Sequence, residues 1–156
     1  MRNGGTVEMK LRVYGVPKPG GSKKGFVNKN TGHVIITEDN KGSKPWRAMC
    51  VSAFLDTLGL GVSEPPGPVY PTGPVRLEII FLMPRPKYHY NSKGFLKESA
   101  PFYHIIAPDS SKLTRSTEDA FKGLAWRDDC QVAIQSVSKI YAEVPGAEIT
   151  ITRIDA

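Results

Sequence analysis

The sequence predicts an α+β fold in a single domain, residues 1–156, in which two main helices pack on a mixed β-sheet. Three observations support this expectation. The length of 156 residues suits one hydrophobic core. Hydrophobic residues make up 40% of the chain, enough to fill such a core. Segments that alternate apolar and polar residues, as strands do, are interspersed with segments whose apolar residues recur at helical spacing.

The first expected strand covers residues 7–14, where apolar residues alternate with charged ones. A loop rich in glycine, proline and lysine follows at residues 15–21. Residues 33–37 form the next expected strand, which can pair with residues 26–28 in a hairpin. The turn of this hairpin is Asn30-Thr31-Gly32.

The first expected helix begins near Ser43, a suitable N-cap, with Pro45 in its first turn. Gly59 and Gly61 end it. Its apolar face comprises Trp46, Met49, Cys50, Ala53, Phe54 and Leu58. Residues 61–74 are rich in proline and glycine and indicate a surface connection rather than a domain boundary.

A second long strand is expected at residues 75–81, stopped by Pro84-Arg85-Pro86 and followed by a loop at residues 87–100. A second helix is expected at residues 111–122. Its buried side comprises Leu113, Thr117, Ala120, Phe121 and Leu124. Two final strands, at residues 131–142 and 147–154, are joined by Val144-Pro145-Gly146.

Composition excludes several classes of protein. The longest apolar runs are far shorter than the roughly 20 residues that span a bilayer, and no secretory signal is expected, so we expect a cytoplasmic protein without a membrane partner. No nucleotide-binding loop is visible, so no nucleotide cofactor is expected. Cys50 and Cys130 fit no zinc-ligand spacing and are expected to be free, buried thiols.

Acidic residues flank the second helix. Asp109 follows Pro108 at its start, and Asp128 and Asp129 precede the next strand. If the carboxylates converge, they suit Mg²⁺ or Mn²⁺ and phosphodiester hydrolysis, with Arg115 or Lys112 against the phosphate. Other interpretations remain open: Asp109 as a helix cap, Asp128-Asp129 as a solvated turn, and Asp119 in an ion pair with Arg115.

A longer pattern contains these residues: Pro108-Asp109-x-x-x-Leu113-x-Arg115-x-x-x-Asp119-Ala120-Phe121, then Asp128-Asp129-x-Gln131-Val132. It resembles the signature of the RusA family of Holliday junction resolvases, Pro-Asp-x-Asp-Asn-Leu-x-Lys, then Asp-Ala-Leu, then Asp-Asp-x-Gln-Val. The resemblance covers nearly the whole chain, since the opening strand, the Trp46 helix and the strand ending at Met83-Pro84 follow in family order. The segment around Arg115 is similar to versions carried by bacteriophages.

The resemblance implies a homodimer that binds four-way DNA junctions in a bacterial host and makes paired nicks with Mg²⁺ or Mn²⁺. By position, Asp109 and Asp129 would be catalytic metal ligands. Asp128 would be a further ligand, Gln131 would support the site, and Arg115 would replace a catalytic lysine.

Three positions depart from the family pattern. Ser111 replaces the second aspartate, Lys112 replaces asparagine, and Arg115 replaces lysine. The site therefore loses about two units of negative charge, so weaker metal affinity is expected. A junction-binding protein with weakened or absent catalysis is the alternative function. Glu118 is expected to be solvated rather than a substitute ligand, since it lies about two helical turns from Ser111.

The formal net charge of +6 permits binding to a phosphate backbone, although a basic interaction domain without a DNA function remains a third interpretation. The expected DNA contacts are Lys18, Lys23, Lys24 and Lys29 on one loop, Arg85, Lys87, Lys93 and Lys97 on another, and Lys112. Aromatic residues interleaved with the second set, including Tyr88, Tyr90 and Phe95, either stack on bases or fold back on the sheet. His104 is expected to be a hydrogen-bonded strand residue rather than a catalytic one.

Overall fold

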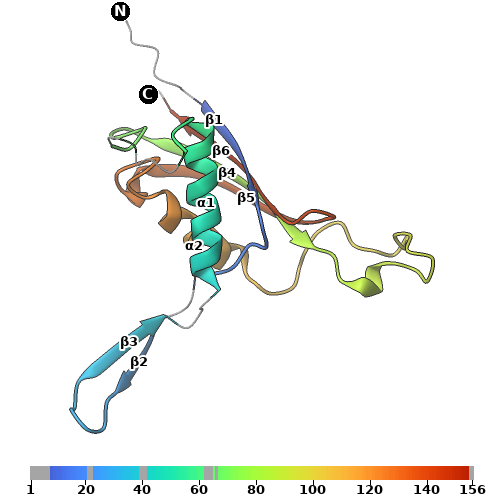
Figure 1. The fold of residues 1–156 in the computed structure, drawn as a ribbon, viewed down its shortest axis with the longest axis horizontal. Coiled ribbons are helices and arrows are strands. Elements are labelled where there is room, and N and C mark those ends of the chain that lie inside the picture. Colours follow the sequence, from blue (N-terminus) through green and yellow to red (C-terminus); the bar gives the residue numbers. More distant parts are fainter. Residues whose placement is uncertain (1–7, 21–22, 39–41, 62–64, 66, 155–156) are drawn as a thin grey trace, which may run out of the picture.

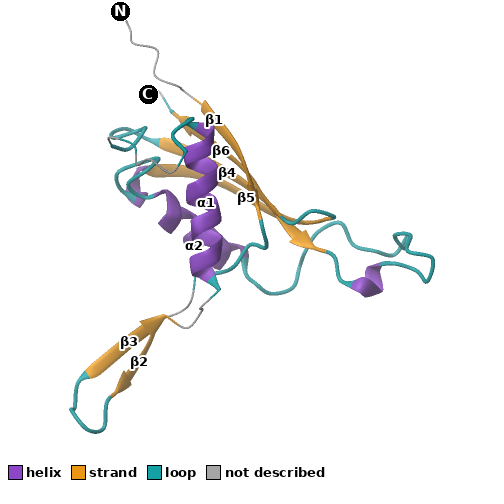
Figure 2. Ribbon diagram, viewed as in Figure 1, coloured by secondary structure: helices purple, strands orange, loops and turns teal. Residues whose placement is uncertain are grey.

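The structure is a computed structural model that describes residues 8–20, 23–38, 42–61, 65 and 67–154. Its elements follow the expected order (Figures 1 and 2). They are β1 (Glu8–Tyr14), β2 (Lys23–Val27), β3 (Val34–Glu38), α1 (Ser43–Thr57), β4 (Val75–Pro84), α2 (Ser110–Phe121), β5 (Val132–Ala142) and β6 (Gly146–Arg153). Two short 3₁₀ turns, Lys87–His89 and Asp129–Gln131, complete the list.

Four strands form the main sheet in the order β1-β6-β4-β5. β4 pairs with β5 in parallel, whereas the other neighbours are antiparallel, so the expected mixed sheet with two helices is confirmed. A parallel pair needs a long crossover. Here the crossover between β4 and β5 contains α2, and this topology places α2 against β5. The domain limits of 1–156 stay a prediction.

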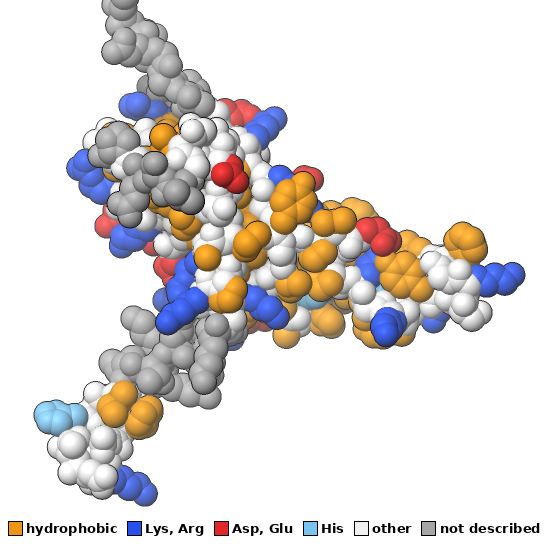
Figure 3. All heavy atoms as spheres, in the orientation of Figure 1, with side chains coloured by type: hydrophobic (Ala, Val, Ile, Leu, Met, Phe, Trp, Pro, Cys, Tyr) orange, Lys and Arg blue, Asp and Glu red, His pale blue; other side chains and the backbone are white. Residues whose placement is uncertain are grey.

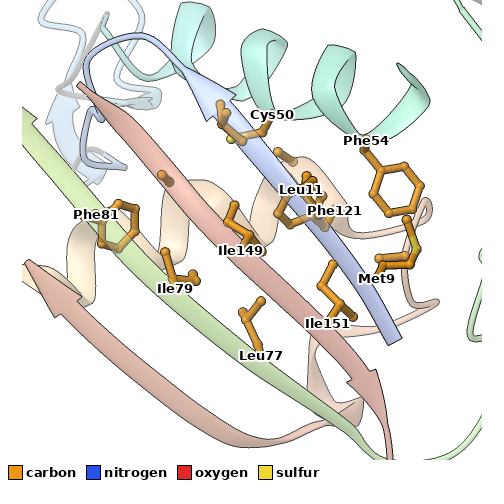
Figure 4. Close-up of a cluster of buried hydrophobic side chains, with 14 of the residues drawn as sticks. Met9, Leu11, Cys50, Phe54, Leu77, Ile79, Phe81, Phe121, Ile149 and Ile151 are labelled. Carbon is orange, nitrogen blue, oxygen red and sulfur yellow. The ribbon is translucent and has the colours of Figure 1, made fainter. Parts of the chain in front are cut away.

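The core lies between one face of this sheet and the two helices (Figure 4). Leu77, Ile79 and Phe81 of β4 are at most 1% exposed, because alternate residues of a strand point to the same face. Ile149 and Ile151 of β6 continue this surface. Each such side chain contributes about 1.5–3 kcal/mol through burial, which fixes the position of both helices on the sheet.

Three expectations fail in detail. Met49, placed on the apolar face of α1, is 43% exposed, because α1 packs mainly against β1 and α2 and this contact does not cover Met49. The N-cap of α1 is Gly42 rather than Ser43. Cys50 is buried, and burial raises its pKa to about 12, but Cys130 is exposed, because it lies in the turn before β5. The expectation of two buried thiols is therefore wrong for Cys130.

A long arm, residues 85–106, leaves the sheet after β4 and returns beside β5 (Figure 1). Hydrophobic side chains gather on its surface (Figure 3). Tyr88 and Phe95 are 67% and 68% exposed, so they stand away from the sheet and can stack. Tyr90, in contrast, folds back, since its hydroxyl donates a hydrogen bond of 2.8 Å to Glu143.

The β2–β3 hairpin forms a separate two-stranded sheet that projects from the main sheet (Figure 1). The sequence predicted this hairpin but placed Lys23 and Lys24 on a loop, whereas both lie in β2 because the pairing with β3 extends to Lys23. Their side chains lie outside the described part of the structure. Among the described residues, neither helix has the length and apolar character needed to cross a bilayer.

Candidate functional site

A pocket of about 470 Å³ lies between α2 and β5, and we call it the α2–β5 pocket. Ser111, Arg115 and Glu118 are spaced by four and three residues, so they share one helix face and line this pocket together. The opposite face of α2 presents the buried side chains of Leu113 and Phe121 to the core. Gln135 of β5 closes the pocket from the sheet side.

Asp109 occupies the N-cap position of α2, but its side chain makes no capping hydrogen bond. The carboxylate lies 3.9 Å from the Nζ of Lys112, in a largely exposed ion pair. Lys139 of β5 donates hydrogen bonds from Nζ to the carbonyl oxygens of Ile106 (2.9 Å) and Pro108 (2.6 Å). These bonds hold the segment before Asp109 against β5, so its carboxylate is positioned without being used as a cap.

Asp129 is held in a fixed orientation near the other end of α2. The indole Nε1 of Trp126, a fully buried residue, donates a hydrogen bond of 2.8 Å to its Oδ1. The charge of Asp129 also acts on Glu118 and helps to raise the pKa of that carboxyl. Asp129 and Glu118 are therefore electrostatic neighbours, although 11 positions separate them in the sequence.

Glu118 differs from its expected state. It is half-buried, and the side-chain amide of Gln135 donates a hydrogen bond to its Oε1. Burial is the main cause that raises its pKa to about 7, followed by repulsion from Asp129 and Asp119. The expectation of a solvated Glu118 is wrong, because β5 packs against this face of α2. The helical spacing from Ser111 places Glu118 on the same face of α2, but the spacing does not show that β5 covers this face.

Asp128 and Gln131 form a reciprocal capping box around the turn that contains Asp129. Asp128 accepts a hydrogen bond from the backbone N–H of Cys130, and this bond is the main reason why its pKa is lowered. The Oε1 of Gln131 accepts bonds from the backbone N–H groups of Arg127 and Asp128.

The amide nitrogen of Gln131 donates to the carbonyl oxygens of Tyr70 (3.0 Å) and Gly73 (3.1 Å). Gln131 therefore links the Asp128-Asp129 turn to the connection before β4. The interpretation of Asp128-Asp129 as a freely solvated turn is therefore wrong, because these side chains accept hydrogen bonds from the protein.

The acidic groups divide between the two ends of α2. Among the described residues, no three histidine, cysteine, aspartate or glutamate side chains gather in a group that could hold a metal ion. Nine positions separate Asp109 from Glu118, about 13 Å along a helix axis. The charge of Asp129 acts on Glu118, whereas Asp109 lies toward the other end of α2. The joint binding of one ion by Asp109, Asp128 and Asp129 stays a prediction.

Cationic groups lie around the same helix. Arg115 is exposed in the pocket, and Asp119 lies 3.9 Å from Arg47 of α1, a different partner from the Arg115 considered above. The loop of residues 15–20, which carries the exposed Lys18, is attached to α2 by a hydrogen bond from the N–H of Gly20 to the carbonyl of Lys112. Lys18 and Lys112 therefore flank the start of α2.

The expected cations of the arm behave in two ways. Lys87, Lys93 and Lys97 are exposed. Arg85, however, donates a hydrogen bond of 2.9 Å to the carbonyl of Pro101 and lies over the ring of Tyr141. Arg85 thus braces the base of the arm.

Comparison with known proteins adds two findings. A family model described as "Endodeoxyribonuclease RusA" matches residues 17–152, from the loop after β1 to the end of β6. The chain is also similar to the "Uncharacterized protein YqaN" of Bacillus subtilis (strain 168), with 29% identity over 151 residues, which cover 95% of this chain and 98% of that protein.

Proposed function

The chain belongs to the RusA family of endodeoxyribonucleases, and on this premise we propose that it resolves four-way DNA junctions by divalent-metal-dependent hydrolysis in the α2–β5 pocket. The observation that carries the proposal is the half-buried Glu118 beside Arg115 in an open pocket, with the charge of Asp129 close enough to help raise the pKa of Glu118. This arrangement combines carboxylate oxygens for a cation with a guanidinium for a phosphate.

The donor chemistry fits Mg²⁺ or Mn²⁺. Mg²⁺ keeps several waters and is commonly bound by one or two carboxylates together with substrate phosphates, so a pair of acids is sufficient. Glu118 and Asp129 would hold the ion. The negative charges of Asp129 and Asp119 help to raise the pKa of Glu118, and a bound divalent cation would offset this repulsion. The family pattern predicts Asp109 and Asp128 as further ligands, and the pair proposed here does not include them. We propose that Asp109 is a catalytic carboxylate at the start of α2.

When bound, the ion supplies an activated water and stabilises charge on the phosphate. The chain's own groups do the rest. Trp126 fixes the Oδ1 of Asp129 through its hydrogen bond, and the capping box of Asp128 and Gln131 holds the turn. Arg115 binds the scissile phosphate with its planar fork of donors and stabilises the additional negative charge of the transition state. The hydroxyl of Ser111 can donate a further hydrogen bond to a phosphate oxygen.

DNA binding is assigned to the exposed cations of two surfaces. Lys18 and Lys112 flank the start of α2, while Lys87, Lys93 and Lys97 lie on the arm. The exposed rings of Tyr88 and Phe95 stack on unpaired bases at the junction centre. Lys23 and Lys24, which lie in β2, remain expected DNA contacts. Paired nicks need two active sites, which a homodimer supplies, and we place this activity in the cytoplasm of a bacterial host, encoded by a phage.

The experiment measures cleavage and metal binding separately. A labelled four-way junction is incubated with wild type, Asp129→Asn, Glu118→Gln and the control Glu148→Gln, whose exposed carboxylate lies on β6, with and without Mg²⁺ or Mn²⁺. Tb³⁺ luminescence sensitised by Trp126 reports occupancy of the site, because that indole contacts Asp129.

Metal-dependent nicking and Tb³⁺ luminescence are both expected for wild type and Glu148→Gln. Both are expected to be lost in Asp129→Asn. A wild-type protein that binds junctions but never cuts them, at any Mg²⁺ or Mn²⁺ concentration, would contradict the nuclease proposal.

A second candidate function is junction binding with weakened or absent catalysis. It is favoured by Ser111, which replaces a family aspartate, together with the lack of a three-acid group among the described residues. Ser111→Asp separates the two functions. Gained cleavage would support the binding-protein interpretation, whereas strong cleavage by wild type would exclude it.

A further inference from the structure

A second pocket, of about 470 Å³, lies where the loop of residues 15–20, the end of β4 and the segment before α2 meet. We call it the His104 pocket. Its walls are mostly apolar and include four prolines, Pro17, Pro19, Pro84 and Pro108. Among the described residues of the wall, only His104 and Lys18 carry ionisable side chains. The pocket therefore combines flat hydrophobic walls with one imidazole and one ammonium group.

His104 is 6% exposed, and its buried Nδ1 has no hydrogen-bond partner among the described residues. The expectation of a hydrogen-bonded strand histidine is therefore wrong for this nitrogen, although the backbone N–H of His104 does bond to Lys139. Burial first, and then the charge of Lys139, lower the pKa of the ring, which favours the neutral form with one donor and one acceptor nitrogen. Buried polar atoms without a partner are rare, because each costs the free energy of desolvation.

The other buried histidine provides a contrast. His89 also packs against the ring of Tyr141, with centroids 4.8 Å apart, compared with 5.0 Å for His104. The Nδ1 of His89 lies 3.3 Å from a guanidinium nitrogen of Arg85, so it has a polar partner inside the protein. Of these two histidines, only His104 is among the residues that line the pocket.

The His104 pocket is joined to the proposed active site through the chain. Pro108, in its wall, directly precedes Asp109 and accepts the short hydrogen bond from Lys139. The loop that carries Lys18 is attached to the first turn of α2 through Gly20 and Lys112. A nucleotide whose phosphate lies at the start of α2 therefore has this pocket beside it.

We infer that the His104 pocket binds one unstacked nucleobase of the DNA strand next to the cleaved phosphate. This inference rests on the proposed function and assigns it a base-reading element. Proline rings and Met83 contact the faces of the base, as apolar side chains do in sites for extruded bases. The imidazole hydrogen-bonds to the edge of the base, and Lys18 binds the phosphate of the same nucleotide.

The test uses imidazole ¹⁵N signals, which resolve well because the chain has only three histidines. Each of the four deoxynucleoside 5′-monophosphates is titrated into the protein in EDTA, and deoxyribose 5-phosphate serves as the probe without a base. We expect at least one nucleotide to shift the His104 signals and leave those of His89 in place. Deoxyribose 5-phosphate is expected to leave both unchanged.

Ala107→Phe fills the pocket from its wall, and Ile105→Phe is its control, since Ile105 is 87% exposed and outside the pocket. The nucleotide response should disappear in Ala107→Phe and persist in Ile105→Phe. His104→Phe keeps a ring against Tyr141 and should weaken the preferred nucleotide roughly 3- to 10-fold, as expected for one net hydrogen bond.

An equal response to deoxyribose 5-phosphate would overturn the inference, as would no response to any nucleotide or a nucleotide response retained by Ala107→Phe. Because the titration contains no divalent cation, a failure of the nuclease proposal does not affect its outcome. Conversely, an empty His104 pocket leaves metal-dependent nicking and Tb³⁺ binding unchanged.

Discussion

Replacement of Glu118 by glutamine measures how much the repulsion from nearby acids and the burial of this carboxylate destabilise the folded protein. The folded protein raises the pKa of this carboxyl from 4.5 to about 7. Between these two pH values the folded state holds a proton that the unfolded state has released. The stability that Glu118 contributes to the folded state is therefore fully present below about pH 4.5, and it is lost as the pH rises to about 7.

The shift corresponds to about 3 kcal/mol at 1.36 kcal/mol per pKa unit. Glu118 is only half-buried, so solvent screening reduces this to about 1–2 kcal/mol. Glutamine is neutral at every pH and can still accept a hydrogen bond from Gln135. The free energy of unfolding of Glu118→Gln is therefore expected to be about 1–2 kcal/mol higher than that of wild type at pH 8. At pH 4.5 the two free energies of unfolding should be nearly equal.

Urea unfolding in EDTA at several pH values measures this difference, with the exposed Glu148→Gln as control. Mg²⁺ at about a hundred times its Kd should reverse the order at pH 8, because a ligand at that concentration stabilises the folded wild type by about 2.7 kcal/mol. A wild-type minus Glu118→Gln difference that does not vary with pH would refute the electrostatic reasoning. Equal Mg²⁺ stabilisation of both proteins would show that Glu118 is not a ligand.

Three further predictions concern other parts of the site. Asp129→Asn should lower the rate of junction nicking by roughly 100-fold or more, because the aspartate binds the metal ion. The affinity for junction DNA, measured by gel shift in EDTA, should stay within about 3-fold of wild type. A parallel loss of DNA affinity would contradict this role. Gln131→Ala should lower the free energy of unfolding by about 1–3 kcal/mol in urea titrations, because it leaves the N–H of Arg127 and the carbonyl of Tyr70 without their partner; an unchanged midpoint would exclude the clamp. Lys18→Ala should reduce the slope of log affinity against log salt by about 1 if this exposed lysine binds a phosphate, whereas an unchanged slope would remove it from the interface.

Local sequence patterns were sufficient for most of the fold. The alternation in β1, β4 and β6 and the apolar spacing of α2 are properties of neighbouring residues, and each element was expected within a few positions of where it lies. Met49 shows the limit of this reasoning. Its spacing places it on the apolar face of α1, but its exposure depends on how much of that face β1 and α2 cover.

The candidate site shows the same division. Asp109 and Asp129 stand out in the sequence through the family pattern. Gln131 makes four side-chain hydrogen bonds, and its role in supporting the site stays a prediction. The sequence predicts a solvated Glu118, because this residue lies about two helical turns from Ser111. Its half-buried state arises from Gln135 on β5, a strand that reaches α2 only through the parallel crossover.

The sequence alone determined the order of elements, the family and the acidic residues that flank α2, since these depend on short-range periodicity and on a linear motif. Tertiary structure alone decided which acids are neighbours. It brought the charge of Asp129 near Glu118 and left Asp109 toward the other end of α2. It also buried an imidazole nitrogen of His104 that has no hydrogen-bond partner within the described part of the chain. The physical reason is that charge repulsion and desolvation depend on distances through space, and these were set only when α2 packed against β5.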